Sequence, residues 1–278
     1  MTYLKKLRSR ADGVGNIICV GLDPVADKIP GGVSGIAPYF IRMLDGLAGE
    51  GCVPACVKPN TAFYEQYGFD GLHALRDVIS YAQTIGIPVI LDAKRGDVGK
   101  TSVAYATACF DFWGADAATV APYMGSDSLL PFFEHCARGK GVYVLVRTSN
   151  AGAHDFQDLP VGCEKLYERV ASLLVSRHVL GVGAVVGATQ PAEFEALSRF
   201  FVCSGKEVPF LIPGVGSQGG SAAQIASVLK HTGNELAIHR INSSSGITYA
   251  HEKEKNTDYV GAAVREFKKL RKEIGFTG

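Results

Sequence analysis

Short runs of consecutive apolar residues recur along this chain of 278 residues, separated by segments with helical spacing. A strand that alternates apolar and polar residues has one face in water, whereas consecutive apolar residues are typical of strands covered on both faces. Helices flanking a parallel sheet provide that cover. The pattern predicts parallel strands at residues 17–22, 55–59, 88–92, 117–120, 142–147, 182–187, 209–214 and 236–242.

The segments between these runs have the spacing of amphipathic helices. Leu72, Leu75, Ile79 and Ala82, for example, share one helical face. Eight strand and helix units fill the chain, which favours an α/β fold of the (β/α)8 TIM barrel type, usually about 250 residues long. An open doubly wound sheet is the alternative, although it normally stops at about five or six strands. Because no linker or composition shift divides the chain, we expect a single domain over residues 1–278.

Composition excludes several kinds of partner. The chain has 28 Lys and Arg against 27 Asp and Glu and no basic run, which argues against nucleic-acid and membrane-surface partners. The longest apolar stretch, 179–188, is too short and glycine-rich to cross about 30 Å of hydrocarbon, and the first ten residues do not resemble a secretory signal. We therefore expect a cytoplasmic protein with a small-molecule substrate. The seven cysteines and seven histidines are isolated, so no metal site is predicted, and the histidines are expected on the surface or on helices.

Charged residues gather after the third run. Asp92 and Lys94 are two residues apart at the end of a strand and therefore share a face, Asp97 follows on the loop, and Lys58 ends the neighbouring run. In a barrel the carboxyl ends of the strands carry the chemistry. Carboxylates on either side keep a lysine protonated, and an ammonium held in this way can donate a proton to a carbanion. The alternative interpretation is a salt-bridge cluster that closes the barrel mouth.

Glycine-rich segments follow the seventh and eighth runs, at residues 213–220 and 242–246. In barrels these turns often bind phosphate through exposed backbone N–H groups. Tight turns without a ligand would have the same composition.

One segment resembles a known signature. Residues 92–101 match D-x-K-x-x-D-V-x-x-T, which is similar to the signature of the orotidine 5′-monophosphate decarboxylase family. Further matching segments follow the family order and cover nearly the whole chain, most like its longer subfamily: Gly21-Leu22-Asp23-Pro24, Lys58-Pro59-Asn60, Pro122-Tyr123-Met124-Gly125, Thr148-Ser149-Asn150 and the segment 213–220.

The resemblance implies a homodimeric TIM barrel that converts orotidine 5′-monophosphate to UMP and CO2 without a metal or organic cofactor. By this resemblance Lys94 protonates C6 of the pyrimidine, Asp92 faces the departing carboxylate, and Lys58 completes the charge network. Asp97 and Thr101 are expected to reach into the partner subunit's site, so that the two active sites are shared. Whether Asp92 repels the substrate carboxylate or orients Lys94 stays open.

The resemblance also implies a set of substrate contacts. Asp23 and Asn60 would bind ribose or the charge network, and Thr148 and Ser149 would bind the pyrimidine. The complete set of expected substrate-binding residues is Asp23, Asn60, Thr101, Thr148, Ser149, Gln218, Gly219, Ser245 and Gly246.

Ser245 departs from the family pattern. The family typically has Asn-x-Ser-Arg-Gly-Ile here, and its arginine contacts the substrate phosphate, whereas this chain has Ser245 before Gly246. A hydroxyl offers one uncharged donor where a guanidinium offers a rigid charged fork. The chain could be an enzyme weakened by a natural or engineered replacement, another cation such as Arg240 or Lys100 could reach the phosphate, or catalysis could have been lost.

Two other functions fit parts of the sequence. One is a different sugar-phosphate decarboxylase or epimerase barrel that uses a metal. The other is a catalytically silent nucleotide-binding subunit, which would have no reason to retain Asp92, Lys94 and Asp97 beside Lys58.

Overall fold

The structure, a computed structural model, describes residues 1–216 and 219–277. Within these ranges eight parallel strands form one sheet, in the order β2-β1-β10-β9-β8-β5-β4-β3. Two isolated parallel bridges, Val57 with Val89 and Asn60 with Asp92, join β2 to β3. The sheet thereby closes into the predicted (β/α)8 barrel, and the open doubly wound sheet is excluded.

Most strands begin and end close to the predicted runs. β3 continues beyond its run because Arg95 pairs with Val120 after an irregularity in register. β10 begins later than predicted, because residues 236–238 form a 3-10 turn instead of extended backbone. The barrel strands are β1 (Ile18–Gly21), β2 (Cys56–Lys58), β3 (Ile90–Arg95), β4 (Ala117–Val120), β5 (Gly141–Arg147), β8 (Val182–Val186), β9 (Phe210–Ile212) and β10 (Arg240–Ser243).

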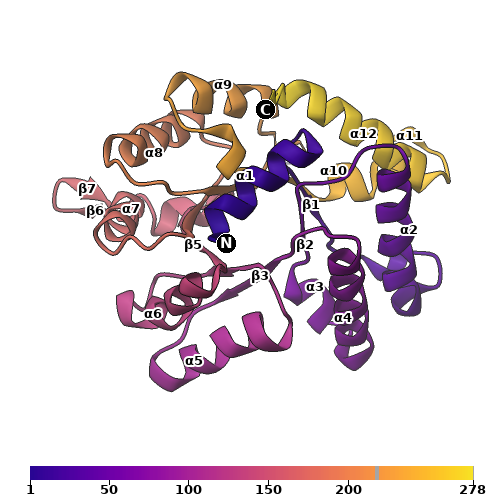
Figure 1. Cartoon of the computed structure of the whole chain (residues 1–278), viewed down its shortest axis with the longest axis horizontal. Coiled ribbons are helices and arrows are strands. Elements are labelled where there is room, and N and C mark those ends of the chain that lie inside the picture. Colours follow the sequence, from indigo (N-terminus) through magenta and orange to yellow (C-terminus); the bar gives the residue numbers. More distant parts are fainter. Residues whose placement is uncertain (217–218, 278) are drawn as a thin grey trace.

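Long helices surround the strands (Figure 1). Their apolar faces pack on the outer faces of the strands, as with Phe40 and Leu44 of α2 and Phe267 of α12, all buried in the main core. The α-helices are α1 (Tyr3–Val14), α2 (Ile36–Gly49), α3 (Thr61–Glu65), α4 (Gly68–Thr84), α5 (Gly99–Thr107), α6 (Ser126–Glu134), α7 (Leu166–Ser176), α8 (Pro191–Cys203), α9 (Ala222–His231), α10 (Ser245–Thr248), α11 (Ala250–Glu254) and α12 (Tyr259–Ile274). In the described ranges, none of these helices has both the length and the apolar character needed to cross a membrane.

Helix α1 covers the amino-terminal end of the barrel. It begins after Thr2, whose side chain accepts a hydrogen bond from the Lys5 N–H, and its residues Tyr3, Leu4 and Leu7 belong to the core inside the barrel. The Tyr3 hydroxyl donates to that of Tyr143, across 3.2 Å. This end is therefore filled and closed by side chains.

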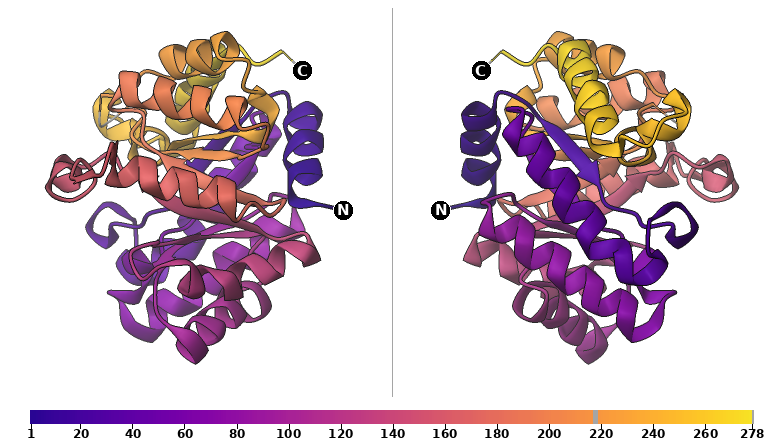
Figure 2. Two further views of the ribbon diagram at one scale, coloured as in Figure 1. Left: turned by 90° about the vertical axis from the view of Figure 1, so that its left-hand side faces the viewer. Right: turned by 90° about the vertical axis from the view of Figure 1, so that its right-hand side faces the viewer.

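The carboxyl-terminal end carries the long connections. Residues 151–165, which follow β5, leave the barrel and include a small hairpin of β6 (Pro160–Val161) and β7 (Glu164–Lys165). Figure 2 shows this excursion on the opposite side of the molecule from α1. This end, opposite α1, is the one where the sequence predicts the chemistry.

Candidate active site

A cavity of about 630 Å³ opens at the carboxyl-terminal end of the barrel. Residues from all eight strands or the loops after them line it, including Leu145, Val185 and Leu211 on its apolar side. The volume is typical of small-molecule sites, which measure about 300–1,000 Å³. Pockets of this type combine apolar walls with a few polar groups that orient a ligand.

Asp92 holds two lysines at one side of this cavity. Its Oδ2 lies 2.7 Å from Lys58 Nζ and its Oδ1 lies 2.7 Å from Lys94 Nζ. The Thr119 hydroxyl donates to the same Oδ1 at 2.8 Å. The side chains of Lys58 and Asp92 are only 6% and 7% exposed, whereas that of Lys94 is 45% exposed. All three side chains line the cavity, and Lys94 is the most accessible member of the network.

Electrostatics keep this network charged. Burial alone lowers the pKa of Lys58, but the carboxylates of Asp92 and Asp23 outweigh it and hold that pKa above its ordinary value. Burial likewise raises the pKa of Asp92, and the two lysines more than reverse this, so that the pKa lies well below its usual range. Both charges are consequently present throughout the neutral pH range.

The backbone at Lys94 is unusual. Lys94 has a φ of +44°, in the left-handed region that non-glycine residues seldom adopt, and it lies within the irregular register of β3 with β4. Its N–H donates to the Thr119 hydroxyl at 3.0 Å. Thr119 therefore supports both the backbone of Lys94 and the carboxylate that holds its ammonium. Strain of this kind is often found at functional sites.

Two unsatisfied acceptors line the same cavity. Asp23 Oδ1 and Asn242 Oδ1 are buried and have no hydrogen-bond partner among the described residues. Asn60 also lines the cavity, but its side-chain oxygen already accepts from the Ala62 N–H at the start of α3. Because buried acceptors are normally hydrogen-bonded, Asp23 and Asn242 are suited to receive donors from a ligand.

Thr148 and Ser149 line the cavity after β5, and their contact with a pyrimidine stays a prediction. The Thr148 hydroxyl donates to Asn150 Oδ1 and accepts from Gln157 Nε2, both at 2.7 Å. The Ser149 carbonyl accepts from the Thr189 hydroxyl at 3.2 Å. Thr148 therefore has most of its hydrogen-bonding capacity engaged within the protein.

The glycine-rich turns are only partly accessible. Gly214 lines the cavity, but Gly219 and Gly246 do not. The N–H groups of Gly219 and Gly220 donate to the Gly216 and Gly214 carbonyls, so they are engaged within the loop. Gln218 lies outside the described residues. A contact of Gly219, Gln218 or Gly246 with a substrate stays a prediction.

Ser245 lines the cavity, and the structure corrects one explanation for the missing arginine. Arg240 is buried at the amino-terminal end of the barrel, where its guanidinium donates to the carbonyls of Leu7, Ala237 and His239. It therefore cannot reach a ligand in the cavity. Lys100 lies on α5 and does not line the cavity, whereas Lys28 does.

Lys28 lies on the loop after β1. Its Nζ is 2.7 Å from Glu252 Oε2 and 5.3 Å from the centre of the Tyr249 ring. Tyr249 holds this loop by accepting from the Val25 N–H and donating to the Asp23 carbonyl. Lys28 is thus a third lysine at the cavity, on the same side as the segment that carries Ser245.

Asp97 and Thr101 do not line the cavity of their own chain. Asp97 accepts from the Val98 N–H, and Thr101 is exposed on α5. Apolar side chains are exposed nearby in sequence, on and around α5 and α6: Val98, Val103, Tyr123, Met124 and Leu130. Among the described residues, neither Asp97 nor Thr101 forms a hydrogen bond or an ion pair with the Asp92 network.

In residues 1–216 and 219–277 no group of His, Cys, Asp and Glu side chains is placed to hold a metal ion. Sequence analysis missed Thr119, Asn242, Asn150 and Lys28 as cavity residues. Thr119 gave one signal, because it is a lone polar residue within an apolar run, and Asn242 gave another, because it begins the polar segment after the eighth run. Asn150 lay inside a matched segment but was not assigned a role, and Lys28 gave no signal.

Comparison with known proteins agrees with this geometry. Residues 16–259 match the model of the orotidine 5′-phosphate decarboxylase / HUMPS family. The chain is 42% identical to an orotidine 5′-phosphate decarboxylase of Natronomonas pharaonis, over 96% of this chain and 97% of that one. It is 39% identical to the corresponding protein of Halorubrum lacusprofundi, over 99% of both.

Solved structures show the same likeness. The Leishmania donovani OMP decarboxylase superposes with a TM-score of 0.77 at 35% identity, covering 98% of this chain and 99% of that one. The L. donovani UMP synthase superposes with a TM-score of 0.80 at 36% identity, and the match covers 99% of this chain but 56% of that longer one. The chain therefore belongs to the orotidine 5′-phosphate decarboxylase / HUMPS family.

Proposed function

We propose that this protein decarboxylates orotidine 5′-monophosphate to UMP. The observation that carries the proposal is the Asp92 network, in which a buried carboxylate holds one buried lysine and presents a second, Lys94, to the cavity. The two relatives described above are named orotidine 5′-phosphate decarboxylases, and their similarity to this protein extends over nearly the whole chain.

The chemistry follows from the position of Lys94. When the bond between C6 and the carboxyl group breaks, its electron pair stays on C6 and CO2 leaves. An ammonium already in place stabilises this localised charge more than it stabilises the delocalised carboxylate, so its effect is selective for the transition state. The proton of Lys94 then forms the new C6–H bond, and solvent restores the ammonium. Asp92 keeps Lys94 in place through the 2.7 Å ion pair.

The unsatisfied acceptors support binding of the sugar. Ribose hydroxyls are donors, and Asp23 Oδ1 and Asn242 Oδ1 are buried acceptors at the cavity without partners among the described residues. Asn60 lies at the junction of β2 and β3 beside Asp92. These three residues are proposed to bind the ribose, while Ser149 and the loop after β5 contact the pyrimidine.

For the phosphate we propose Lys28 and Ser245 in place of an arginine. Both line the cavity, and the Lys28 side chain is 41% exposed, so it can exchange Glu252 for a stronger anion. A lysine supplies charge without the bidentate fork of a guanidinium, so phosphate binding is expected to be weaker than with arginine. The protein is then an active enzyme with a high KM.

Asp97 and Thr101 are proposed to complete the site of a second subunit in a homodimer. Neither residue lines the cavity of its own chain, and apolar side chains are exposed on and around α5 and α6, such as Tyr123 at 85% exposure; both observations support this arrangement. Mixing inactive Lys94→Ala and Asp97→Ala dimers and allowing subunits to exchange should restore about one quarter of the wild-type activity, since half of the dimers are mixed and each has one intact site. No recovery after verified exchange would contradict the shared site.

The function itself is tested with the wild-type protein. Release of CO2 and the change in absorbance of orotidine 5′-monophosphate are followed with and without EDTA, beside sugar phosphates with added Mg²⁺. Turnover of the nucleotide that EDTA does not affect supports the proposal. Metal-dependent turnover of a sugar phosphate, or binding of the nucleotide without release of CO2, would overturn it.

A further inference from the structure

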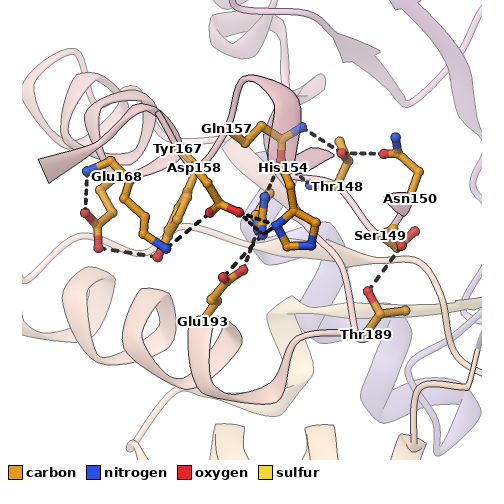
Figure 3. Close-up of polar contacts among 12 residues, drawn as sticks. Thr148, Ser149, Asn150, His154, Gln157, Asp158, Tyr167, Glu168, Thr189 and Glu193 are labelled. Carbon is orange, nitrogen blue, oxygen red and sulfur yellow. Dashed lines mark hydrogen bonds and ion pairs between the residues drawn. The ribbon is translucent and has the colours of Figure 1, made fainter. Parts of the chain in front are cut away.

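The cavity rim after β5 is held by a side chain that does not line the cavity. We call residues 148–150 the rim segment. Gln157, on the excursion 151–165, contacts Thr148 twice (Figure 3). Its Oε1 accepts from the Thr148 N–H at 3.0 Å, and its Nε2 donates to the Thr148 hydroxyl at 2.7 Å. One amide thus holds both the backbone and the side chain of a cavity residue.

These contacts also set the direction of the Thr148 hydroxyl. The Gln157 amide nitrogen can only donate, so the Thr148 oxygen accepts from it and its own proton is directed to Asn150 Oδ1 at 2.7 Å. The Asn150 oxygen is then engaged and its amide N–H groups stay available as donors. The orientation of Gln157 therefore determines the hydrogen-bonding pattern of two residues at the cavity.

The rim segment also packs closely against the residues that follow β8. A Cβ at Gly187, just after β8, would lie 2.9 Å from the Ser149 Cβ and 3.0 Å from its N atom. Only glycine permits this approach without a shift of the backbone. Thr189 adds a hydrogen bond to the Ser149 carbonyl. The rim segment is therefore held at Thr148 by Gln157 and at Ser149 by the residues after β8.

Arg147 anchors the excursion that carries Gln157. Its side chain is 2% exposed and forms ion pairs with Glu193 of α8 and, at 3.3 Å, with Asp158. Its Nη1 lies 3.4 Å from Gln157 Oε1. With two carboxylates around it and no place in the cavity lining, Arg147 fixes the base of the excursion rather than binding a ligand.

We propose that Gln157 is a positioning residue that acts through Thr148 to set the rim segment for binding the pyrimidine. This inference rests on the proposed function. Thr148 and Ser149 are half-buried at the cavity. Without the amide of Gln157, the Thr148 hydroxyl would rotate and the backbone of the rim segment would lose its alignment with the cavity. Because the rim contacts a part of the substrate that does not react, the loss is expected chiefly in binding, with KM raised about tenfold and kcat changed by less than about threefold.

The test is a double-mutant cycle in the full-length protein. Gln157→Met keeps the length of the side chain and removes both hydrogen bonds, Thr148→Val removes the hydroxyl, and the double variant combines them. Asp155→Asn serves as the matched control, since Asp155 is exposed on the same excursion and makes no hydrogen bond to the rim segment among the described residues. KM and kcat for orotidine 5′-monophosphate, Kd for UMP by calorimetry and Tm are measured for each.

A rise in KM and Kd of about tenfold for Gln157→Met, little further change in the double variant, and wild-type constants for Asp155→Asn are expected, because residues that act through one another are not additive. Unchanged KM for Gln157→Met, or effects of the two substitutions that simply add, would overturn the inference. If Gln157→Met does not fold, a wild-type KM for Thr148→Val would overturn it equally. An inactive wild-type protein would instead refute the proposed function.

Discussion

A cationic side chain is buried at each end of this barrel, and the two side chains have different hydrogen-bond acceptors. At the amino-terminal end, Arg240 donates to three backbone carbonyls beneath α1, beside Tyr3 and Tyr143. At the carboxyl-terminal end, Lys58 is paired with Asp92, and Asp92 also holds a second, half-exposed lysine at an open cavity. Arg240 meets only neutral acceptors, whereas the lysines meet a carboxylate.

The difference separates a structural from a functional charge. Arg240 donates to three backbone carbonyls at the closed end and is 1% exposed, so no ligand reaches it. Lys94 and Asp92 are arranged so that one charge of the network stays accessible. Buried charge is therefore informative about function only when the same group of charges reaches a cavity.

Among variants that leave Lys94 in place, the largest effect is expected from Lys58→Met. Without Lys58, Asp92 is neutralised by Lys94 alone, and that ammonium is drawn away from the reacting carbon. We expect kcat to fall by at least about 10³-fold, comparable to the loss of a preorganised group in other active sites. Steady-state kinetics with orotidine 5′-monophosphate measure this, and a kcat within threefold of wild type would show that Lys58 has only a packing role.

Arg240→Met should affect stability and leave catalysis intact. It removes three hydrogen bonds to backbone carbonyls, and we expect a loss on the order of 3 kcal/mol in the free energy of unfolding. Urea unfolding measures the loss, and kcat and KM at 25 °C should stay within twofold of wild type. A variant of normal stability and reduced kcat would contradict the division between the two ends.

The pH dependence of stability should also distinguish the charge pairs of the Asp92 network from the neutral contacts of Arg240. Folding lowers the pKa of Asp92 and raises that of Lys58, so the pair contributes fully between their ordinary values of 3.8 and 10.5. As the pH falls below 3.8, Asp92 is protonated in the unfolded chain before it is protonated in the folded protein. The contribution of the pair to the free energy of unfolding is then lost progressively until the pH reaches the lower pKa of Asp92 in the folded state. The stability difference between wild type and Asp92→Asn should be constant from about pH 5 to pH 9 and shrink below about pH 4. A difference that persists unchanged at pH 3 would argue against the charge pairing.

The smallest effects are expected at the phosphate end of the cavity. Ser245→Arg adds a charged fork and should lower KM about tenfold with kcat little changed, because charge-assisted hydrogen bonds are about twice as strong as neutral ones. Lys28→Ala should raise KM several-fold, with Lys253→Ala, an exposed lysine of α11, as its control. An unaltered KM in Ser245→Arg would contradict the proposal that Ser245 weakens phosphate binding.

Sequence patterns predicted the barrel and the centre of its site for physical reasons. Consecutive apolar residues identify strands covered on both faces, and Asp92, Lys94 and Lys58 were found because they end such strands. One of the three explanations for the missing arginine, that Arg240 reaches the phosphate, was wrong, because Arg240 contacts Leu7, 233 positions away in the sequence. His239 was expected on the surface or on a helix but is fully buried. There, burial and then the charge of Arg240 lower its pKa to about 3, so it stays neutral and accepts from the Phe210 N–H.

The central claim is that Lys94 acts on the reacting carbon from the open end of the barrel. The most direct test compares turnover of orotidine 5′-monophosphate by wild type, Lys94→Ala and Lys5→Ala, the last an exposed lysine of α1 at the closed end. The account predicts a kcat at least about 10⁴-fold lower for Lys94→Ala with an unchanged Tm, and wild-type kinetics for Lys5→Ala. A Lys94→Ala protein that turns over the nucleotide within tenfold of the wild-type rate would contradict it.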